Sequence, residues 1–459
     1  MVFSNLTFIF AFLPIFFILY FIVPKKIKNF IILIFSLIFY AWGEIKYIPL
    51  LIFSSVVDYL NGLFIYKYKD SNKKKIFLLL SIIINVGVLF IFKYSNFIIS
   101  NINSIFNINI PNGNIPLPLG ISFFTFQTMS YSIDVYRGKF NPEKNFINFM
   151  TYVTMFPQLV AGPIVKYDEI KDDLHNKKLS LNNFSEGLFI FVIGLIKKVL
   201  LANNLGYIYT ILFSDITNAS LLSSWLCLLC FTLQIYFDFS GYSDMASGLG
   251  KILGFNYPKN FNYPYITQSI TDFWRRWHMT LSSWFKDYVY IPLGGNRCSK
   301  VKNTRNILIV WLLTGIWHGA SWNFLFWGLY FGIILILEKT ILKRILDKIP
   351  TFIKHIYAIF LIMIGWAIFS VNNMSEFTLF IQKLFINKNI IDNNFIFYLR
   401  EYYIFIVFGI IFSTPIIKLK LFKNKCFMLL GYIITFILFI ICISYLISDS
   451  YNPFLYFRF

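Results

Sequence analysis

The sequence predicts an all-α protein that crosses a membrane several times. Of its 459 residues 58% are hydrophobic and only 14% are charged, which is more apolar surface than one water-soluble core can bury. Apolar stretches close to the ~20 residues needed to cross the hydrocarbon recur at 6–23, 76–92, 322–337 and 429–447. The net charge of +20 lies in short segments between such stretches, so it reports membrane topology rather than nucleic-acid binding.

The first apolar stretch, residues 6–23, is expected to stay in the protein as a membrane helix. A signal peptide would have a basic segment before it and a small-residue cleavage site after it. Neither is present before the lysines at 25, 26 and 28.

Loop charges predict the orientation of the spans, because cytoplasmic loops retain Lys and Arg. Lysines follow the first span at 25–28 and lie at 67–75, whereas the long connection 94–118 carries no charge. Later basic segments lie at 343–354 and 418–425, and 371–401 is balanced. We expect the basic loops inside, the uncharged and balanced segments outside, and both termini outside.

The middle of the chain is organised differently, because Pro, Gly and polar residues interrupt apolar runs at 116–120, 156–163 and 236–244. Backbone broken at membrane depth must be buried in protein or line a cavity. We therefore expect a ring of transmembrane helices, with re-entrant and interfacial helices around a central funnel. The chain is interpreted as one domain, 1–459, with N-terminal spans at 1–116, a catalytic core at 117–340 and C-terminal spans at 341–459.

Two cysteines, Cys227 and Cys230, have C-x-x-C spacing but lie inside the apolar run 221–231 with no second ligand pair nearby. A thiolate is costly in hydrocarbon. We interpret them as packing residues and expect no metal site there.

Among four histidines, His318 alone lies between two strongly apolar segments. The apolar segment 306–317 is too short to cross, so a helical hairpin is expected, with His318 at its turn within the bilayer and both ends cytoplasmic. Gly319 and Ala320 would permit close approach of a ligand. An ionisable residue at this depth indicates a substrate or proton path, and imidazole can move a proton between hydroxyl and leaving group. The alternative is a neutral histidine bonded to a backbone carbonyl.

A second cluster, at 272–297, interleaves aromatic and charged residues. The spacing of Trp274, Trp277, His278, Leu281 and Trp284 predicts one amphipathic interfacial helix. An anchoring role explains most of these residues, but His278 falls on the apolar face and could pair with His318.

Other motifs are uninformative or absent. Asp238 and Asp244 could orient a histidine, or they could be loop carboxylates at the water boundary. Gly294 and Gly295 are too few for a phosphate-binding loop, and the sequence has no P-loop, H-E-x-x-H or G-x-S-x-G pattern, which argues against nucleotide hydrolysis and serine-triad chemistry.

Four motifs in this order resemble the membrane-bound O-acyltransferases of the alginate O-acetyltransferase branch, over essentially the whole chain. They are Trp-His-Gly at 317–319, Arg-Arg-Trp-His at 275–278 with 290–295, the segment 234–244, and the segment 156–163. The resemblance implies a tunnel from the cytosol to the outer face, a catalytic histidine at His318 and a second functional histidine at His278.

The resulting hypothesis is a multi-pass O-acetyltransferase of a bacterial cell membrane. It would use acetyl-CoA as a donor that is not tightly bound, and act on a surface polysaccharide such as peptidoglycan or an alginate-like polymer, with an extracytoplasmic partner protein. Arg275, Arg276, Trp277, Lys286 and Trp317 are the candidate donor-binding residues. D-alanyl transfer to teichoic acid remains an alternative, since eight basic residues at 259–305 would attract either donor. A transporter of polysaccharide or lipid-linked sugar is another alternative, although the sequence shows no paired repeat.

Overall fold

The computed structural model describes residues 2–111, 113, 115–416, 425–448, 451–453 and 455. Regular structure in these ranges is helical. Lys418, Lys420 and Lys423 of the expected cytoplasmic loop lie outside them. Within the described ranges, eight helical segments are long and apolar enough to cross a membrane, namely Lys25–Lys67, Lys73–Phe106, Leu181–Ser214, Leu221–Ile252, Trp322–Thr340, Thr351–Ser370, Asn393–Phe412 and Leu429–Ser448. The prediction of an all-α polytopic membrane protein is confirmed.

The chain forms two compact units. The first comprises Met1–Phe191 and Ser243–Pro258, and the second comprises Val192–Tyr242 and Lys259–Phe459. Helices α10 (Leu181–Ile196) and α12 (Leu221–Ile252) therefore contribute residues to both. The division into 1–116, 117–340 and 341–459 is one by expected role, does not follow these units, and stays a prediction.

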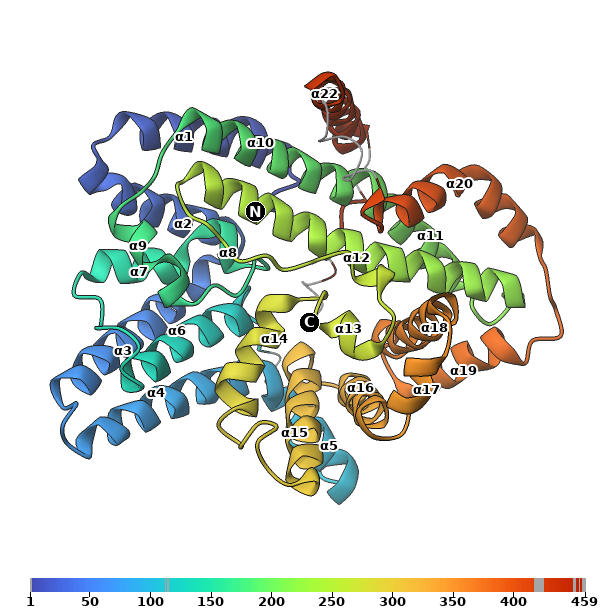
Figure 1. Ribbon diagram of the computed structural model, residues 1–459, viewed down its shortest axis with the longest axis horizontal. Coiled ribbons are helices and arrows are strands. Elements are labelled where there is room, and N and C mark those ends of the chain that lie inside the picture. Colours follow the sequence, from blue (N-terminus) through green and yellow to red (C-terminus); the bar gives the residue numbers. More distant parts are fainter. Residues whose placement is uncertain are drawn as a thin grey trace. The chain divides into compact units, whose positions relative to one another are not determined.

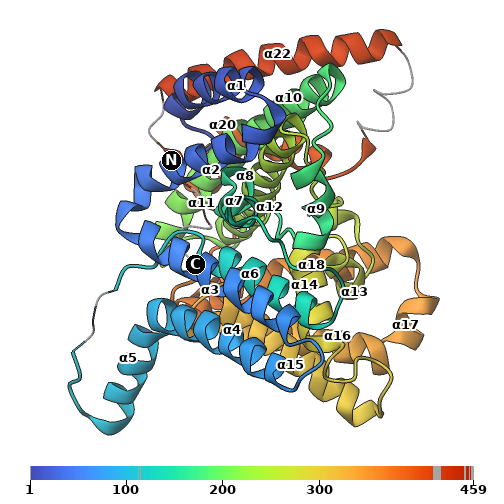
Figure 2. The same cartoon turned by 90° about the vertical axis from the view of Figure 1, so that its left-hand side faces the viewer.

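The first unit is built on three helices packed side by side, α3 (Ile48–Lys67), α4 (Lys73–Leu89) and α6 (Ile121–Tyr136) (Figures 1 and 2). Asp58 of α3 is fully buried between them and accepts hydrogen bonds from Ser81, from Asn85 Nδ2 at 2.6 Å and from Ser132 Oγ at 2.7 Å. A buried carboxylate requires such donors, so this cluster fixes the register of the three helices. The unit's other described helices before α10 are α1 (Leu13–Ile22), α2 (Lys28–Glu44), α5 (Ser95–Phe106), α7 (Phe146–Thr154), α8 (Phe156–Leu159) and α9 (Tyr167–His175).

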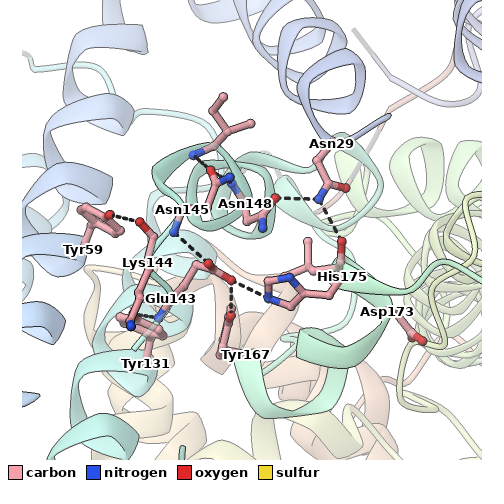
Figure 3. A network of polar contacts seen from close by, with 12 residues as sticks. Asn29, Tyr59, Tyr131, Glu143, Lys144, Asn145, Asn148, Tyr167, Asp173 and His175 are labelled. Carbon is pink, nitrogen blue, oxygen red and sulfur yellow. Dashed lines mark hydrogen bonds and ion pairs between the residues drawn. The ribbon is translucent and has the colours of Figure 1, made fainter. Parts of the chain in front are cut away.

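A polar network holds α9 in this unit (Figure 3). Glu143 Oε2 accepts a hydrogen bond from Tyr167 Oη at 2.7 Å and lies 2.9 Å from His175 Nε2. Asn29 Nδ2 of α2 donates to the carbonyl of Leu174 at 2.9 Å. Residues at both ends of α9 therefore have hydrogen-bond partners, which explains how this short polar helix packs against apolar neighbours.

The second unit surrounds a core of large aromatic side chains, among them the fully buried Trp327, Trp366 and Phe331. Helix α16 (Trp322–Thr340) packs against α13 (Ile270–Trp274), α15 (Lys300–His318) and α18 (Thr351–Ser370) (Figure 1), and aromatic side chains of these helices contact one another. Besides parts of α10 and α12, its described helices are α11 (Asn204–Ser214), α13 (Ile270–Trp274), α14 (Met279–Phe285), α15 (Lys300–His318), α16 (Trp322–Thr340), α17 (Lys343–Lys348), α18 (Thr351–Ser370), α19 (Met374–Phe385), α20 (Asn393–Phe412) and α22 (Lys425–Ser448).

Helix α12 runs unbroken through 236–244 for 32 residues, so the expected interruption there is wrong. Asp238 is buried, and its side chain pairs with Lys198 inside the second unit. Gly241 lets two backbones approach, because an added Cβ would lie 2.8 Å from the carbonyl oxygen of Gly194. Tertiary partners, and not a change of secondary structure, account for the polar residues of this run.

The expected hairpin is present, formed by α15 and α16, with His318 as the last residue of α15. The first arm is longer than expected, because α15 begins at Lys300, where Ser299 caps it by accepting a hydrogen bond from Lys302 N. Its 19 residues correspond to a length of about 28 Å. Helix α15 is nevertheless not among the eight candidate spans, and its first six residues include Lys300, Lys302 and Arg305. Whether this arm crosses the membrane, and the depth of His318 in the bilayer, stay predictions.

Gly328 lets the two helices of the hairpin pack closely, and this contact leads to a first prediction. A Cβ added at Gly328 would lie 2.3 Å from the backbone oxygen of Trp311, and backbone cannot yield as a flexible side chain can. We expect Gly328→Ala to lower the free energy of unfolding by about 1–3 kcal/mol, measured as earlier thermal unfolding of the detergent-solubilised protein. Gly431→Ala is the matched control, since nothing lies within 4 Å of its added Cβ. Equal melting temperatures for the two variants would contradict this account of the hairpin.

Candidate active site

His318 ends α15 inside an aromatic enclosure. His318 is 5% exposed. The imidazole centroid lies 5.0 Å from the ring of Trp317, 4.9 Å from Trp327 and 5.4 Å from Phe369, with interplanar angles of 77° to 83°. These rings come from α15, α16 and α18. Such an apolar enclosure keeps water away from the imidazole.

Gly319, next to His318, makes room for protein and not for a ligand. Its backbone is extended, with φ of −168°, and an added Cβ would lie 2.2 Å from the ring of Phe324. The glycine therefore serves the packing of Phe324, which in turn contacts Phe369 at 5.0 Å between ring centroids. This differs from the expected use of Gly319 as an opening for substrate.

His278 lies at a break between two short helices, so the prediction of one continuous amphipathic helix is wrong. Helix α13 ends at Trp274 and α14 begins at Met279, and His278 has a left-handed backbone with φ of 41°. A residue in this conformation cannot continue a right-handed helix. The aromatic residues that suggested one helix have different surroundings: Trp274 and Trp277 belong to the core of the second unit, whereas Trp284 contacts Phe285 and Tyr288.

Trp317 brings the two predicted histidines together. The ring of His278 lies 6.1 Å from that of Trp317, and the ring of His318 lies 5.0 Å from it. On another side His278 meets the edge of Phe239 at 4.6 Å. His278 and Trp317 are 1% and 4% exposed, so both histidines belong to one buried site in the second unit.

Sequence reasoning missed Asn260, the polar partner of His278. Its Oδ1 lies 3.1 Å from His278 Nδ1 and accepts hydrogen bonds from Thr280 N at 3.3 Å and Thr280 Oγ1 at 2.9 Å. Asn260 lies in an irregular segment between α12 and α13, where no periodic pattern could single it out. Burial lowers the pKa of His278 from 6.5 to about 3, so this imidazole, which lies outside the candidate spans, is neutral at physiological pH.

Glu338 was also missed, and it positions α13. Its Oε1 accepts a hydrogen bond from Ile270 N at 2.7 Å, and its Oε2 accepts from Thr271 N at 2.8 Å. Glu338 is 6% exposed. A carboxylate at a helix N-terminus satisfies amides that have no partner inside the helix. This contact comes from the far end of α16, which no local pattern could reveal.

The predicted donor-binding cations differ in their accessibility. Arg275 and Lys286 are exposed. Arg276 is partly buried, and its Nε lies 3.0 Å from both carboxylate oxygens of Asp272. Arg275 and Lys286 can thus meet a soluble anion as they stand, whereas Arg276 is already engaged in an ion pair.

The predicted donor-binding tryptophans are core residues of the second unit. Trp277 is 3% exposed and its ring lies 4.8 Å from that of Trp366. Trp317 lies between the two histidines, as described above. Their contribution to a donor site would be to form its wall.

The remaining histidines have other partners. His175, which lies in the first unit, has a half-exposed side chain beside Glu143 (Figure 3). His355 Nδ1 lies 2.7 Å from the carbonyl oxygen of Thr267 and donates to it. Cys227 and Cys230 are both 0% exposed within the hydrophobic core, which confirms that they are packing residues.

The profile of the membrane-bound O-acyltransferase family matches residues 139–382. A probable alginate O-acetylase of Azotobacter vinelandii is 41% identical over 381 residues, covering 82% of this chain and 76% of the relative. A peptidoglycan O-acetyltransferase of Helicobacter pylori is 37% identical over 411 residues, covering 82% and 78%. A teichoic acid D-alanyltransferase of Bacillus subtilis is 28% identical over 237 residues, covering 49% and 60%.

The matched profile covers more than half of the chain and includes both histidines of the buried site. The resemblance found in the motifs at 156–163, 234–244, 275–295 and 317–319 is thereby confirmed. This chain is a multi-pass membrane protein that belongs to the membrane-bound O-acyltransferase family.

Proposed function

We propose that this enzyme transfers acetyl groups from cytosolic acetyl-CoA toward a polysaccharide of the bacterial cell surface, with His318 as its catalytic base. The observation that carries the proposal is the position of His318, at the end of α15 within an aromatic enclosure shared with a second histidine. The relatives of greatest coverage quoted above are named for O-acetylation of alginate or peptidoglycan.

The reaction needs one residue that removes a proton from the acceptor hydroxyl and then donates a proton to the leaving thiolate. His318 takes the proton from a hydroxyl of the acceptor while that oxygen attacks the carbonyl carbon of the thioester. The carbon–sulfur bond then breaks, and the same imidazole gives its proton to the leaving thiolate. The products are an acetyl ester and the free thiol of coenzyme A. The surrounding rings of Trp317, Trp327 and Phe369 exclude water, which would otherwise compete as the nucleophile.

An anionic donor is favoured by the charge of the second unit. Seven of the eight basic residues at 259–305 are exposed, namely Lys259, Arg275, Lys286, Arg297, Lys300, Lys302 and Arg305. Together they would attract the phosphates of acetyl-CoA. Arg275 and Lys286 are the proposed contacts nearest in sequence to His278. The same charge would also attract an acidic carrier protein, so it does not distinguish the two donors.

Sequence identity to the relatives distinguishes acetyl transfer from D-alanyl transfer better than the charge of the second unit does. The D-alanyltransferase relative matches about half of this chain at 28% identity, whereas the acetyl-transferring relatives match 82% of it at 37–41%. Acetyl transfer is therefore proposed over D-alanyl transfer.

The proposed route places donor and acceptor on opposite sides of the membrane. The coenzyme stays at the cytosolic face and extends its neutral pantetheine arm through a narrow passage to His318. Moving the charged part through hydrocarbon would cost several kcal/mol or more. A hydroxyl on an extracytoplasmic partner protein or on the polysaccharide approaches from outside. Trp317, Trp322 and Trp277 would form part of the passage wall, within the ring of helices proposed for the fold.

Sidedness gives the second prediction. Right-side-out membrane vesicles are prepared from producing cells. In one sample radiolabelled acetyl-CoA is sealed inside the vesicles, and in the other it is added only to the outer medium. We expect label in alkali-labile esters of macromolecular material only when the coenzyme is inside, because its phosphates must meet the cytosolic face. Vesicles carrying His318→Ala provide the background. Equal labelling from external coenzyme would exclude the proposed donor side.

A further inference from the structure

The side-chain oxygen of Asn260 is the shared acceptor of three groups around His278. Two of them belong to Thr280, whose backbone N–H lies 3.3 Å away and whose hydroxyl lies 2.9 Å away. The third is His278 Nδ1, at 3.1 Å. A backbone N–H can only donate, so an oxygen, and not the NH₂ group of the amide, must face Thr280.

This orientation settles which ring nitrogen of His278 carries the proton. An oxygen acceptor requires a donor opposite it, so Nδ1 is protonated. The residue is 1% exposed, and burial disfavours its charged form. A neutral imidazole has one N–H, and the lone pair is therefore on Nε2.

Asn260 also binds the backbone next to His278 and so helps to set the orientation of the His278 ring. Its carbonyl oxygen accepts a hydrogen bond from Met279 N at 2.9 Å, and its side chain accepts from Thr280 N. The first two amides of α14 are thus satisfied by one residue, while His278 is kept at a φ of 41°, a conformation that non-glycine residues rarely adopt. Such a backbone persists only where its surroundings determine it.

We propose that Asn260 is a positioning residue for acyl transfer, which fixes His278 as the neutral Nδ1–H tautomer and leaves Nε2 as the hydrogen-bond acceptor of the site. In that state His278 Nε2 accepts a hydrogen bond from a donor group of the bound substrate other than the reacting hydroxyl and orients the substrate, while His318 removes the proton of the acceptor hydroxyl. This inference rests on the proposed function for its effect on transfer. The assignment of the tautomer rests only on the contacts of Asn260.

The tautomer can be observed directly, because the chain has only four histidines. The full-length protein, labelled with ¹⁵N in the histidine rings, is measured by NMR in detergent or lipid. The signals of His278 are identified as those lost in His278→Asn. We expect His278 to show a protonated Nδ1 and an unprotonated Nε2 at neutral pH. A protonated Nε2 in the unmodified protein would overturn the proposal, whatever the behaviour of the variants.

Two substitutions separate the role of Asn260 from general packing. Asn260→Ala removes the shared acceptor, and we expect mixed tautomers of His278 and about 100-fold slower acetyl transfer, the loss that a misplacement of about 1 Å can cause. Thr280→Val is the matched control. It removes only the hydroxyl donor and leaves Nδ1 bonded to Asn260, so the tautomer should persist and transfer should change by less than about 10-fold. An unchanged tautomer in Asn260→Ala would overturn the proposal.

His278→Asn tests the use made of Nε2. Asparagine tolerates the left-handed backbone and can place an N–H near the oxygen of Asn260, but it has no group at the position of Nε2. We expect normal accumulation and strongly reduced transfer. Full transfer by this variant would overturn the role of His278, and with it that of Asn260 in the reaction. Activity that survives in His318→Ala would instead contradict the proposed function, so the two failures are distinguishable.

Discussion

Replacement of His318 by alanine is expected to lower acetyl transfer by about 10²–10⁴-fold, the usual contribution of a general base, while the protein still accumulates in the membrane. Its imidazole is the group proposed to carry the proton between acceptor and thiolate. The ring is enclosed by Trp317, Trp327 and Phe369, so water or a neighbouring side chain cannot easily replace it. The measurement is incorporation of labelled acetyl groups into alkali-labile esters, normalised to the amount of protein.

Two further variants separate chemistry from packing. His318→Gln preserves much of the side-chain volume inside the enclosure and should be as inactive as His318→Ala, because an amide does not accept a proton at neutral pH. His355→Ala removes a histidine of the same unit whose Nδ1 donates to the Thr267 carbonyl at 2.7 Å, and it should retain most activity. Near-native transfer by His318→Gln would rule out acid–base catalysis by this residue.

The sequence was sufficient for features that depend on local composition and spacing. Long apolar stretches at 76–92, 322–337 and 429–447 predicted spans, because hydrocarbon leaves few other solutions for a buried backbone. The stretch 6–23 instead forms a shorter apolar helix, Phe8–Ile22, which is not among the eight candidate spans. The short segment Trp317–Ser321 between two apolar arms predicted the hairpin and the place of His318 at its end. The motifs around His278 and His318 predicted the family.

The sequence failed where distant partners decide the local structure. The periodicity around Trp274 and Trp284 suggested one helix, but Asn260 and Glu338 bind the backbone at the starts of α14 and α13 and favour two. The polar run containing Asp238 suggested a break in the membrane segment, although a buried lysine lets α12 continue through it. In each case the deciding group is far away in the chain, and its identity follows from tertiary packing alone.

The ion pair between Lys198 and Asp238 is expected to carry a large share of the stability of the second unit. Lys198 Nζ lies 2.6 Å from Asp238 Oδ1, and the two side chains are 4% and 2% exposed. Lys198 also donates to the carbonyl of Pro453, and Asp238 Oδ2 accepts from Leu455 N at 2.8 Å. The pair therefore connects the π-helix η5 (Lys197–Asn203), α12 and the segment around Pro453.

Removing one charge leaves the other buried without its counter-ion, which typically costs about 3–5 kcal/mol. We expect Asp238→Asn and Lys198→Met each to lower the thermal stability of the solubilised protein strongly. The double variant Lys198→Met with Asp238→Asn should be more stable than either single variant, because no uncompensated charge remains. Acetyl transfer should fall with stability, since Phe239, the neighbour of Asp238 in α12, contacts the His278 ring at 4.6 Å. If the losses of the two single variants simply add in the double variant, the side chains do not interact as an ion pair and α12 is held by its apolar contacts instead.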